Sequence, residues 1–459
     1  MNTAASNTVF HLTQHKDTKQ YAESCKPGDD VMILAEGCCY NMDCYKTKVN
    51  NNVLIVGTSG SGKTRSIVTP NILQASGSYV ISDPKGVLYK KYAVYLRKKG
   101  YQVRKLNFAD PGDAENASYN FFRYIRNDQD ILKIANMLVN AAYTSERIHN
   151  LDPFWDDSTE LLLVAIIHYL HHHTTNECQN LKHILRLAQA CEVVVDNEEE
   201  KNPLDFLFED VEEYNADDFG VACYKQFRQS AGRTLKSILI TLFSKLSVFN
   251  TPQLRHMLAE DTVRIDEIGK RKTAVFVIVS DTDRSMDKLA NIFFSQAMNE
   301  LCSTADEMPG QRLPVDVRFI LDDFATNVQI AEFPRMISSI RSRGISAMLM
   351  IQSESQLTSA YGEDGRTIIS NCDTYVYLGG NDVETARSVA RRADTNLRQI
   401  LYMPIGECWV FRRGQFPVKT NIIDLDEWIE KHKEKRENKA PSKAPSKMSF
   451  DELLDECFR

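Results

Sequence analysis

The sequence lacks any long hydrophobic run. Its longest apolar stretch, residues 161–167, ends at His168, well short of the roughly 20 residues that a membrane-spanning helix needs. The N-terminus has neither the basic start nor the apolar run of a secretory signal peptide. We therefore expect a protein that starts and stays in the cytoplasm.

Cysteine spacing typical of metal fingers is also absent. The 11 cysteines are irregularly spaced, as expected of reduced thiols in the cytoplasm. Only residues 38–44 bring three of them together, without a fourth ligand at finger-like spacing. The four histidines within 168–173 indicate the polar end of an amphipathic helix rather than a metal site.

An excess of positive charge is missing as well. The 459 residues carry a net charge of -7, with 43% hydrophobic and 25% charged residues. This composition is typical of a soluble globular protein of two or three structural units, and it excludes a disordered chain or a small disulfide scaffold. The surface as a whole does not indicate nucleic-acid binding.

Short apolar runs alternate with helical stretches from Asn52 onward, the pattern of an α/β protein. Near-continuous apolarity predicts strands that are buried on both faces, as in a parallel sheet. The clearest of these runs are 53–56, 79–81, 274–279, 317–321, 347–351 and 374–378. Between 128 and 262 the strand pattern disappears and the periodicity becomes helical.

A phosphate-binding loop follows the first predicted strand. Its glycines let backbone N–H groups wrap a phosphate, and the helix that follows adds its positive end. Lys63 is expected to reach the β- and γ-phosphates of ATP, and the Thr64 hydroxyl to hold Mg²⁺. The predicted nucleotide-binding residues are Gly57, Thr58, Ser59, Gly60, Ser61, Gly62, Lys63 and Thr64, which match the P-loop pattern in full.

Two acids, Asp322 and Asp323, follow the strand predicted at 317–321. We expect Asp322 to bind Mg²⁺, directly or through water. Asp323 stands where a general base polarises the attacking water. In the alternative interpretation both acids only cap a following helix.

Four other polar residues are candidates for the same site. Gln352 and Asp83 follow two of the predicted strands, at the ends where open α/β sheets place their ligands. Gln352 is predicted to sense the γ-phosphate or align water, and Asp83 to contact the nucleotide, although each could be structural. Arg341 and Arg343 lie at a predicted rim, where they could reach the nucleotide of a neighbouring subunit in a ring, or be surface arginines without a function.

The motifs together resemble those of the type IV coupling proteins, the TraG/TraD-type ATPases of conjugation and type IV secretion. The resemblance covers roughly residues 50–425. The matching segments are, in order, the phosphate-binding loop, 83–89, 118–120, 153–155, 230–237, 322–325, 341–345, 352–353 and 370–372.

This resemblance implies a RecA-like P-loop nucleotide-binding domain of the α/β class with an inserted all-α domain. It also implies a homo-hexameric ring that uses ATP and Mg²⁺, recruits a relaxase–DNA complex and drives single-stranded DNA into a secretion channel. The expected units are 1–50, of unclear role; 51–127 and 263–425, the nucleotide-binding domain; 128–262, the all-α domain; and 426–459, a charged linker with a short acidic segment at 449–459.

Three departures from the family pattern stand out. The usual N-terminal membrane helices are not found, so we expect docking at the cytoplasmic membrane through the secretion channel or an anchor protein. Asp323 replaces the usual glutamate and is about one methylene shorter, which predicts slow hydrolysis. Val87 also stands where the family carries a glutamate.

Charge is unevenly distributed along the chain. Residues 85–105 carry eight Lys or Arg and no acid, whereas 196–218 carry 11 acids against one Lys. The basic stretch could line a pore and stack DNA bases on its tyrosines, or it could be a solvated helix whose tyrosines pack on the sheet. The acidic stretch suits either a protein partner such as a relaxosome component or a solvated loop. The tyrosines concerned are Tyr89, Tyr92, Tyr95 and Tyr101.

The sequence therefore favours an ATP-driven motor that moves single-stranded DNA. One alternative is a recruitment adaptor that binds nucleotide with little turnover, consistent with Asp323 and with a docking role for 449–459. Another is an ATPase that secretes protein effectors without DNA.

Overall fold

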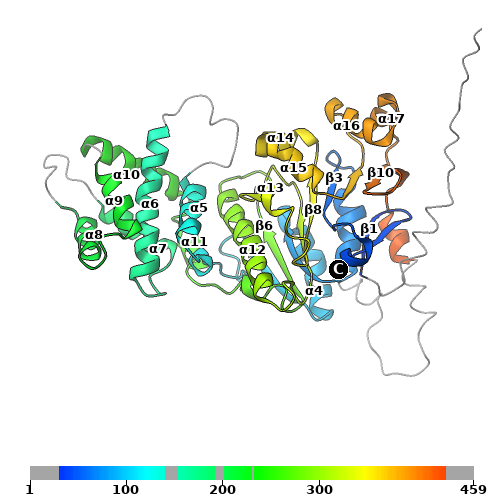
Figure 1. Cartoon of the computed structure of the whole chain (residues 1–459). Helices are drawn as coiled ribbons and strands as arrows, with labels where there is room; N and C mark the ends of the chain where they lie inside the picture. Colours follow the sequence, from blue (N-terminus) through cyan, green and yellow to red (C-terminus); the bar gives the residue numbers. More distant parts are fainter. Residues whose placement is uncertain (1–29, 140–152, 192–200, 230–231, 431–459) are drawn as a thin grey trace, which may run out of the picture.

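The structure is a computed structural model that describes residues 30–139, 153–191, 201–229 and 232–430 (Figure 1). Within these ranges, no helix combines the length and the apolarity needed to cross a membrane. The acidic segment predicted at 449–459 lies outside the described residues. So do the side chains of the motif positions 153–155 and 230–233.

A nine-stranded sheet forms the core of one half of the molecule. Its order is β11-β10-β9-β3-β8-β7-β4-β6-β5. The strands from β9 to β5 run parallel, and β10 and β11 add an antiparallel hairpin at one edge. The strands are β3 (Val53–Val56), β4 (Ser78–Ser82), β5 (Gln102–Asn107), β6 (Thr273–Ile278), β7 (Val317–Leu321), β8 (Ile345–Ile351), β9 (Thr374–Tyr377), β10 (Glu407–Arg412) and β11 (Val418–Asn421).

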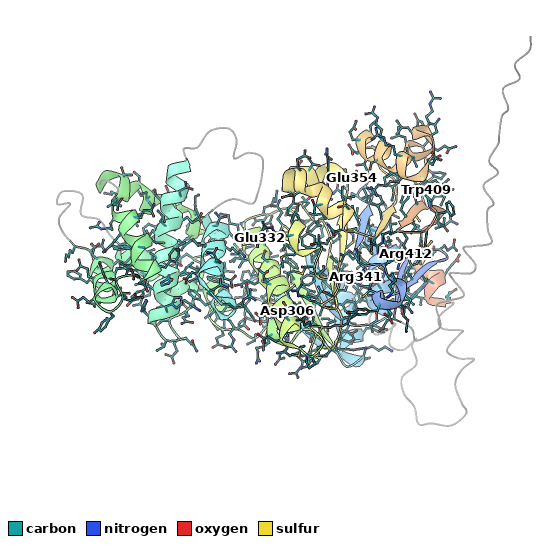
Figure 2. The ribbon with its side chains drawn as sticks, viewed as in Figure 1. Asp306, Glu332, Arg341, Glu354, Trp409 and Arg412 are labelled. Atoms are coloured by element: carbon teal, nitrogen blue, oxygen red, sulfur yellow. The ribbon has the colours of Figure 1, made fainter. Side chains whose placement is uncertain are left out.

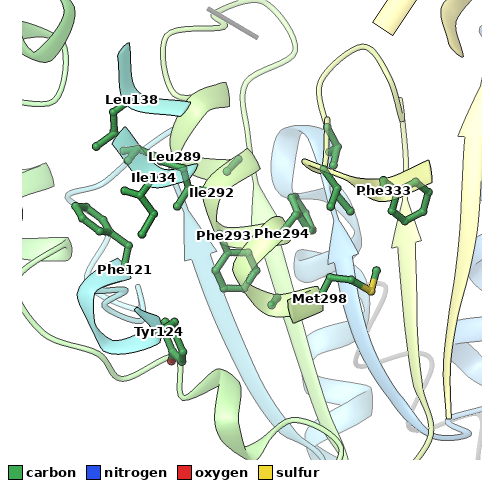
Figure 3. Close-up of a cluster of buried hydrophobic side chains, with 14 of the residues drawn as sticks. Phe121, Tyr124, Ile134, Leu138, Leu289, Ile292, Phe293, Phe294, Met298 and Phe333 are labelled. Carbon is green, nitrogen blue, oxygen red and sulfur yellow. The ribbon is translucent and has the colours of Figure 1, made fainter. Parts of the chain in front are cut away.

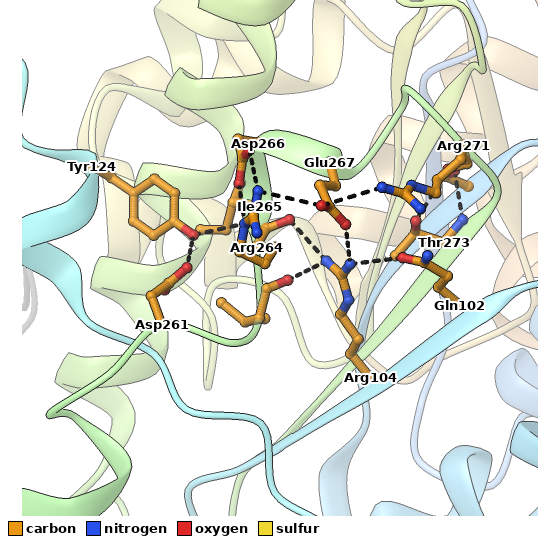
Figure 4. Close-up of polar contacts among 12 residues, drawn as sticks. Gln102, Arg104, Tyr124, Asp261, Arg264, Ile265, Asp266, Glu267, Arg271 and Thr273 are labelled. Atoms are coloured by element: carbon orange, nitrogen blue, oxygen red, sulfur yellow. Dashed lines mark hydrogen bonds and ion pairs between the residues drawn. The ribbon is translucent and has the colours of Figure 1, made fainter.

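The six strands predicted from apolar runs are confirmed, with ends shifted by two residues at most. The prediction did not include β5 and β10 among the clearest runs, because neither is continuously apolar. Strand β5 lies at the sheet edge and carries Arg104, which donates hydrogen bonds to Glu267 at 2.7 Å and to the Arg264 carbonyl at 2.8 Å (Figure 4). Strand β10 alternates buried and half-buried residues, the pattern of a strand near a sheet edge.

Helices cover both faces of the sheet. Successive residues of β3 point to opposite sides, so Leu54 belongs to the hydrophobic cluster that includes α12, whereas Ile55 belongs to the cluster that includes α3 and α4. The helices in these clusters include α3 (Thr69–Leu73), α4 (Val87–Lys98) and α12 (Asp287–Glu307). Burial on both faces explains why these strands are rich in valine and isoleucine.

The described part of the N-terminal segment belongs to the nucleotide-binding half. Strands β1 (Val31–Ala35) and β2 (Cys38–Asn41) form a hairpin, followed by the short helix α2 (Cys44–Thr47). The Asn71 side chain bonds both backbone groups of Ile33, at 3.1 Å to its N–H and 2.6 Å to its carbonyl. The hairpin therefore packs over the helix that leaves the phosphate-binding loop.

A lobe of helices forms the other half, at the left of Figure 1. It shares one continuous hydrophobic core with the sheet domain. Figure 3 shows Ile134 of this lobe, and Phe121 just before the lobe in the chain, beside Leu289 and Ile292 of α12. Packing rather than a linker therefore joins the halves. The lobe contains α5 (Asp128–Val139), α6 (Pro153–His173), α7 (Leu181–Ala190), α8 (Pro203–Tyr214), α9 (Phe219–Arg228), α10 (Gly232–Ser247) and α11 (Pro252–Met257).

Acids of the stretch 196–218 cap helices of this lobe. Asp205 forms a capping box with Asn202 at the start of α8 and pairs with Arg228 at 2.9 Å. Asp218 caps α9 by accepting from the Val221 N–H at 3.0 Å. Local helix chemistry therefore accounts for some of these charges.

Short helices complete the nucleotide-binding half. Along the chain they follow the strands β7, β8 and β9 (Figure 1). They are α13 (Phe333–Met336), α14 (Glu354–Tyr361), α15 (Gly365–Ser370), α16 (Val383–Ala393) and α17 (Leu397–Leu401).

Candidate nucleotide-binding site

The phosphate-binding loop leaves β3 at the carboxyl edge of the parallel strands and continues into a helical turn, Lys63–Val68, and α3. Gly62 has a φ of 89°, in the left-handed region that favours glycine. A Cβ at Gly57 would lie 2.6 Å from Ser61 Oγ and 2.9 Å from Leu378 Cβ. The loop can therefore keep this path only with glycines at these two positions.

The side chain of Lys63 folds back over the loop. Its ammonium donates hydrogen bonds to the Gly57 carbonyl at 2.6 Å and to the Thr58 carbonyl at 3.0 Å. Burial lowers the pKa of Lys63, and the charges of Asp322 and Asp323 oppose that shift. The ammonium is thus held where the glycine loop would cradle a phosphate.

Thr64 and Asp322 meet across the sheet edge. The Thr64 hydroxyl donates to Asp322 Oδ2 at 3.0 Å, although 258 positions separate the two residues in sequence. Burial raises the pKa of Asp322, and the neighbouring charge of Asp323 raises it further. A hydroxyl and a carboxylate are the hard oxygen ligands that Mg²⁺ prefers.

A buried hydroxyl also fits a bound phosphate. Ser61 Oγ is buried without a hydrogen-bond partner among the described residues, and such groups normally have one. Together with the ammonium of Lys63 and the Thr64–Asp322 pair, it makes a donor and ligand set suited to a magnesium-bound nucleotide.

Asp323 lies in a turn rather than at a helix start. Its φ is 50°, its N–H donates to Asp322 Oδ1 at 3.1 Å, and its carbonyl accepts from the Asn327 N–H at 3.0 Å. The next helix, α13, begins only at Phe333. The alternative in which both acids cap a following helix is therefore wrong.

Gln352 follows β8, which lies between β3 and β7 in the sheet. The strand order therefore places it between the phosphate-binding loop and the acid pair. Its side chain is exposed and its N–H donates to Gln356 Oε1 at 2.8 Å. Its role in sensing the γ-phosphate stays a prediction.

Asp83 is buried at the end of β4 and anchors α4. Its two carboxylate oxygens accept from the N–H groups of Leu88 at 3.0 Å and Tyr89 at 2.7 Å. Burial is the main cause that raises the pKa of Asp83 to about 6, and the charge of Asp322 adds to it. Both oxygens are thus engaged by the helix start, and a direct nucleotide contact stays a prediction.

Arg341 and Arg343 lie at the opposite edge of the sheet, because they precede β8 whereas the loop follows β3. The seven residues of β8 separate the two edges by about 20 Å, so neither arginine reaches the nucleotide site of its own chain. Arg341, labelled in Figure 2, donates to the Cys44 carbonyl at 2.8 Å. Arg343 donates two hydrogen bonds to the carboxylate of Asp306, from Nε to Oδ1 at 2.7 Å and from Nη2 to Oδ2 at 2.8 Å.

The tyrosines of the basic stretch are buried, which contradicts their predicted role in base stacking. Tyr95 donates to the Leu73 carbonyl and Tyr101 to the Gly77 carbonyl, each at 2.6 Å. The alternative, tyrosines packed on the sheet, is confirmed. Their exposed fractions are 8% for Tyr89, 2% for Tyr92, 1% for Tyr95 and 5% for Tyr101.

Some basic side chains of the same stretch also serve the fold. Lys105 pairs with Asp113 at 2.6 Å, and Lys85 pairs with Asp281 at 2.8 Å. Lys90 and Lys91 are exposed on α4. A contact with DNA through this outer face of α4 stays a prediction.

Two contacts beside the phosphate-binding loop were not predicted from the sequence. The Thr58 N–H donates to the Gly379 carbonyl at 3.3 Å, and Arg65 pairs with Asp426 at 2.7 Å. The Gly379–Gly380 pair directly after a predicted strand was the one available signal, since glycines often mark a close approach of the backbone.

Comparison with known proteins identifies relatives over most of the chain. A profile of the family described as type IV secretory system conjugative DNA transfer matches residues 8–395. The type IV secretion system-coupling protein VirD4 of Bartonella henselae is 22% identical over 380 residues, 77% of this chain and 54% of VirD4. The conjugal transfer protein TraG of Escherichia coli is 23% identical over 363 residues, 75% of this chain and 55% of TraG. The chain thus spans about half the length of the curated relatives it matches.

Solved structures show the same fold. The unbound bacterial conjugative coupling protein TrwBdeltaN70 superposes with a TM-score of 0.63 at 17% identity, over 89% of this chain and 92% of that chain. TrwB in complex with ADP and Mg²⁺ superposes with a TM-score of 0.62 at 17% identity, over 88% and 92%. The predicted fold, a RecA-like P-loop domain with additional helices, is confirmed. Because the family profile covers most of its length, this chain belongs to the type IV secretory system conjugative DNA transfer family.

Proposed function

We propose that this chain is a type IV coupling protein ATPase that recruits a relaxase–DNA substrate and drives single-stranded DNA through a conjugative secretion channel. The observation that carries the proposal is the convergence of Lys63, Thr64 and Asp322 at one edge of the sheet. Family membership supplies the substrate class. TrwB, which shares the fold, binds ADP with Mg²⁺ and the analogue ADPNP in solved structures.

In this proposal each residue of the site has one task. Lys63 holds the β- and γ-phosphates. Thr64 and Asp322 would hold Mg²⁺, which would neutralise charge on the phosphate oxygens. Asp323 accepts a proton from the attacking water as the water oxygen bonds to the γ-phosphorus and the bond to the β-phosphate oxygen breaks. Gln352 orients that water.

The proposed assembly is a homo-hexameric ring at the cytoplasmic face of the membrane, docked through the secretion channel or an anchor protein. Arg341 and Arg343 lie at the sheet edge opposite their own nucleotide site, which suits contact with a neighbouring subunit. In a ring, they would stabilise charge on the neighbour's γ-phosphate as arginine fingers.

The length of Asp323 supports a second candidate function. An aspartate reaches about 1.5 Å less far than a glutamate, the length of one C–C bond, which would slow proton transfer from water. The chain would then be a recruitment adaptor in which ATP assembles the ring with little turnover. An ATPase that secretes protein effectors without DNA is a separate alternative, which the length of Asp323 does not favour.

Steady-state ATP hydrolysis tests the choice between these functions. The full chain is measured with and without single-stranded DNA, beside Lys63→Ala. The motor predicts stimulation of several-fold by DNA, lost in the variant. Tight nucleotide binding with negligible turnover would instead favour the adaptor, and turnover that ignores DNA would favour an effector ATPase.

A further inference from the structure

The last turns of α6 carry histidines that face carboxylates from two other helices. His168 and His172 are four residues apart, so their side chains lie on one face of the helix. Asp128, the first residue of α5, places Oδ1 3.5 Å from His168 Nε2 and 3.3 Å from His172 Nε2. These three ligand atoms lie within 4.8 Å of one another.

Those separations match the spacing of ligands around a small metal ion. Zinc binds imidazole nitrogen and carboxylate oxygen at about 2.0–2.2 Å in tetrahedral geometry, which puts neighbouring ligand atoms about 3.3–3.5 Å apart. Asp128 and His172 have side chains 46% and 41% exposed, whereas that of His168 is only 6% exposed. The group thus has one buried anchor and two ligands that solvent can reach.

The second nitrogen of His168 also lacks a normal partner. His168 Nδ1 is buried without a hydrogen bond among the described residues, and the nearest carboxylate atom, Asp218 Oδ1, lies 3.5 Å away. Metal-bound histidines usually donate their other N–H to a carboxylate that fixes the ring. Asp218 is held ready for this by the Val221 N–H on Oδ1 and by His173 on Oδ2, each at 3.0 Å.

The backbone beside His168 leaves room for this arrangement. A Cβ at Gly220 would lie 2.6 Å from His168 Nδ1 and 3.1 Å from Asp218 Oδ1. A fixed histidine between two carboxylates is the arrangement of a carboxylate–histidine–metal site.

We infer that Asp128, His168 and His172 bind a divalent transition metal ion, with Asp218 positioning His168 from behind. Imidazole and carboxylate ligands suit zinc. The ion would tie the start of α5 to the end of α6 and, through Asp218, to the start of α9. The inference differs from the expectation that the histidines mark only the polar end of a helix, because the sequence could not show the two aspartates that face them.

Titration with Zn²⁺ tests the inference on the full chain, free of nucleotide and of chelator. Wild type should bind one Zn²⁺ ion. His172→Gln and Asp128→Asn should each lower the affinity for this ion at least 100-fold. Asp218→Asn should weaken binding about 10- to 100-fold, as other losses of a supporting carboxylate do, because asparagine still caps α9. His256→Gln is a matched control on an exposed histidine outside the cluster.

His173→Gln separates this site from a second possible one. His168, His173 and Asp218 form another group of suitable spacing, in which His173 would be a ligand. Our assignment predicts that His173→Gln keeps the Zn²⁺ affinity within threefold and that Zn²⁺ raises the melting temperature of this variant but not of His172→Gln. The assignment is overturned if His173→Gln abolishes Zn²⁺ binding while His172→Gln does not. It is also overturned if wild type binds no Zn²⁺, or if His172→Gln binds Zn²⁺ as tightly as wild type.

Discussion

Replacing Asp323 by asparagine isolates its carboxylate from the turn that carries it. The φ of 50° lies in the left-handed region, where asparagine and aspartate are the best tolerated residues after glycine. The N–H donated to Asp322 and the carbonyl that accepts from Asn327 belong to the backbone and survive the change. We expect the free energy of unfolding to stay within about 0.5 kcal/mol of wild type.

The effect on catalysis should be large by comparison. An asparagine cannot accept the proton of the attacking water, and a positioned general base contributes about 10²- to 10⁴-fold to a rate. The kcat for ATP hydrolysis should therefore fall by that factor, which corresponds to about 3–5 kcal/mol of activation free energy. Lys63, Thr64 and Asp322 keep their side chains, so the affinity for Mg²⁺-ADPNP should change far less than kcat.

The assay is single-turnover ATP hydrolysis with thermal melting and analogue binding measured on the same samples. Asp323→Glu is the companion variant: it restores about 1.5 Å of reach, at a cost of about 1–2 kcal/mol for the left-handed turn. A gain in its turnover would identify a motor limited by a short base. If the Asp323→Asn variant keeps more than a third of the wild-type turnover, the assignment of Asp323 as the general base is refuted.

Other predictions concern the loop, the anchor of α4 and the rim. Gly57→Ala should weaken binding of Mg²⁺-ADPNP at least tenfold, seen by calorimetry, because the new Cβ would lie 2.9 Å from Leu378 Cβ; unchanged affinity would contradict the steric argument. The folded-state pKa of Asp83 is raised from its ordinary 3.8 to about 6, so the folded state binds more protons between these values and stability should fall as pH rises through this window, by up to about 3 kcal/mol. Urea unfolding of Asp83→Asn should lack that part of the pH dependence, and an identical profile would count against it. Arg343→Ala should lower turnover about 10³-fold or more if it serves a neighbouring site, and mixing it with Asp323→Asn should restore part of the activity, because a mixed ring contains intact sites; no recovery would leave Arg343 with only its ion pair to Asp306.

The sequence predicted the central strands and the nucleotide loop because their physics is local. Strands buried on both faces must be apolar throughout, and the loop needs its glycines within eight residues of Thr64. The edge strand β5 was less clear, since Arg104 and Lys105 are balanced by acids elsewhere in the chain. The roles of Tyr89, Tyr92 and Tyr95 depended on which side of α4 meets the sheet, and periodicity left that open.

Two arrangements of the site and of the helical lobe could not be predicted from the sequence. Asp83 follows a strand, as ligand-binding acids do, yet the turn after it brings the N–H groups of α4 back to its carboxylate. Asp128 and Asp218 meet His168 only because α5, α6 and α9 pack together. Neither arrangement leaves a signature in residue spacing.

Displacement of streptavidin from the biotinylated end of single-stranded DNA measures directed movement most directly. The full chain is incubated with the DNA, Mg²⁺ and ATP, beside Lys63→Ala and beside wild type with ADPNP. A motor predicts displacement that requires ATP hydrolysis and is lost in both controls. ATP turnover at the wild-type rate with no displacement from either DNA end would contradict the proposed role in driving DNA transfer.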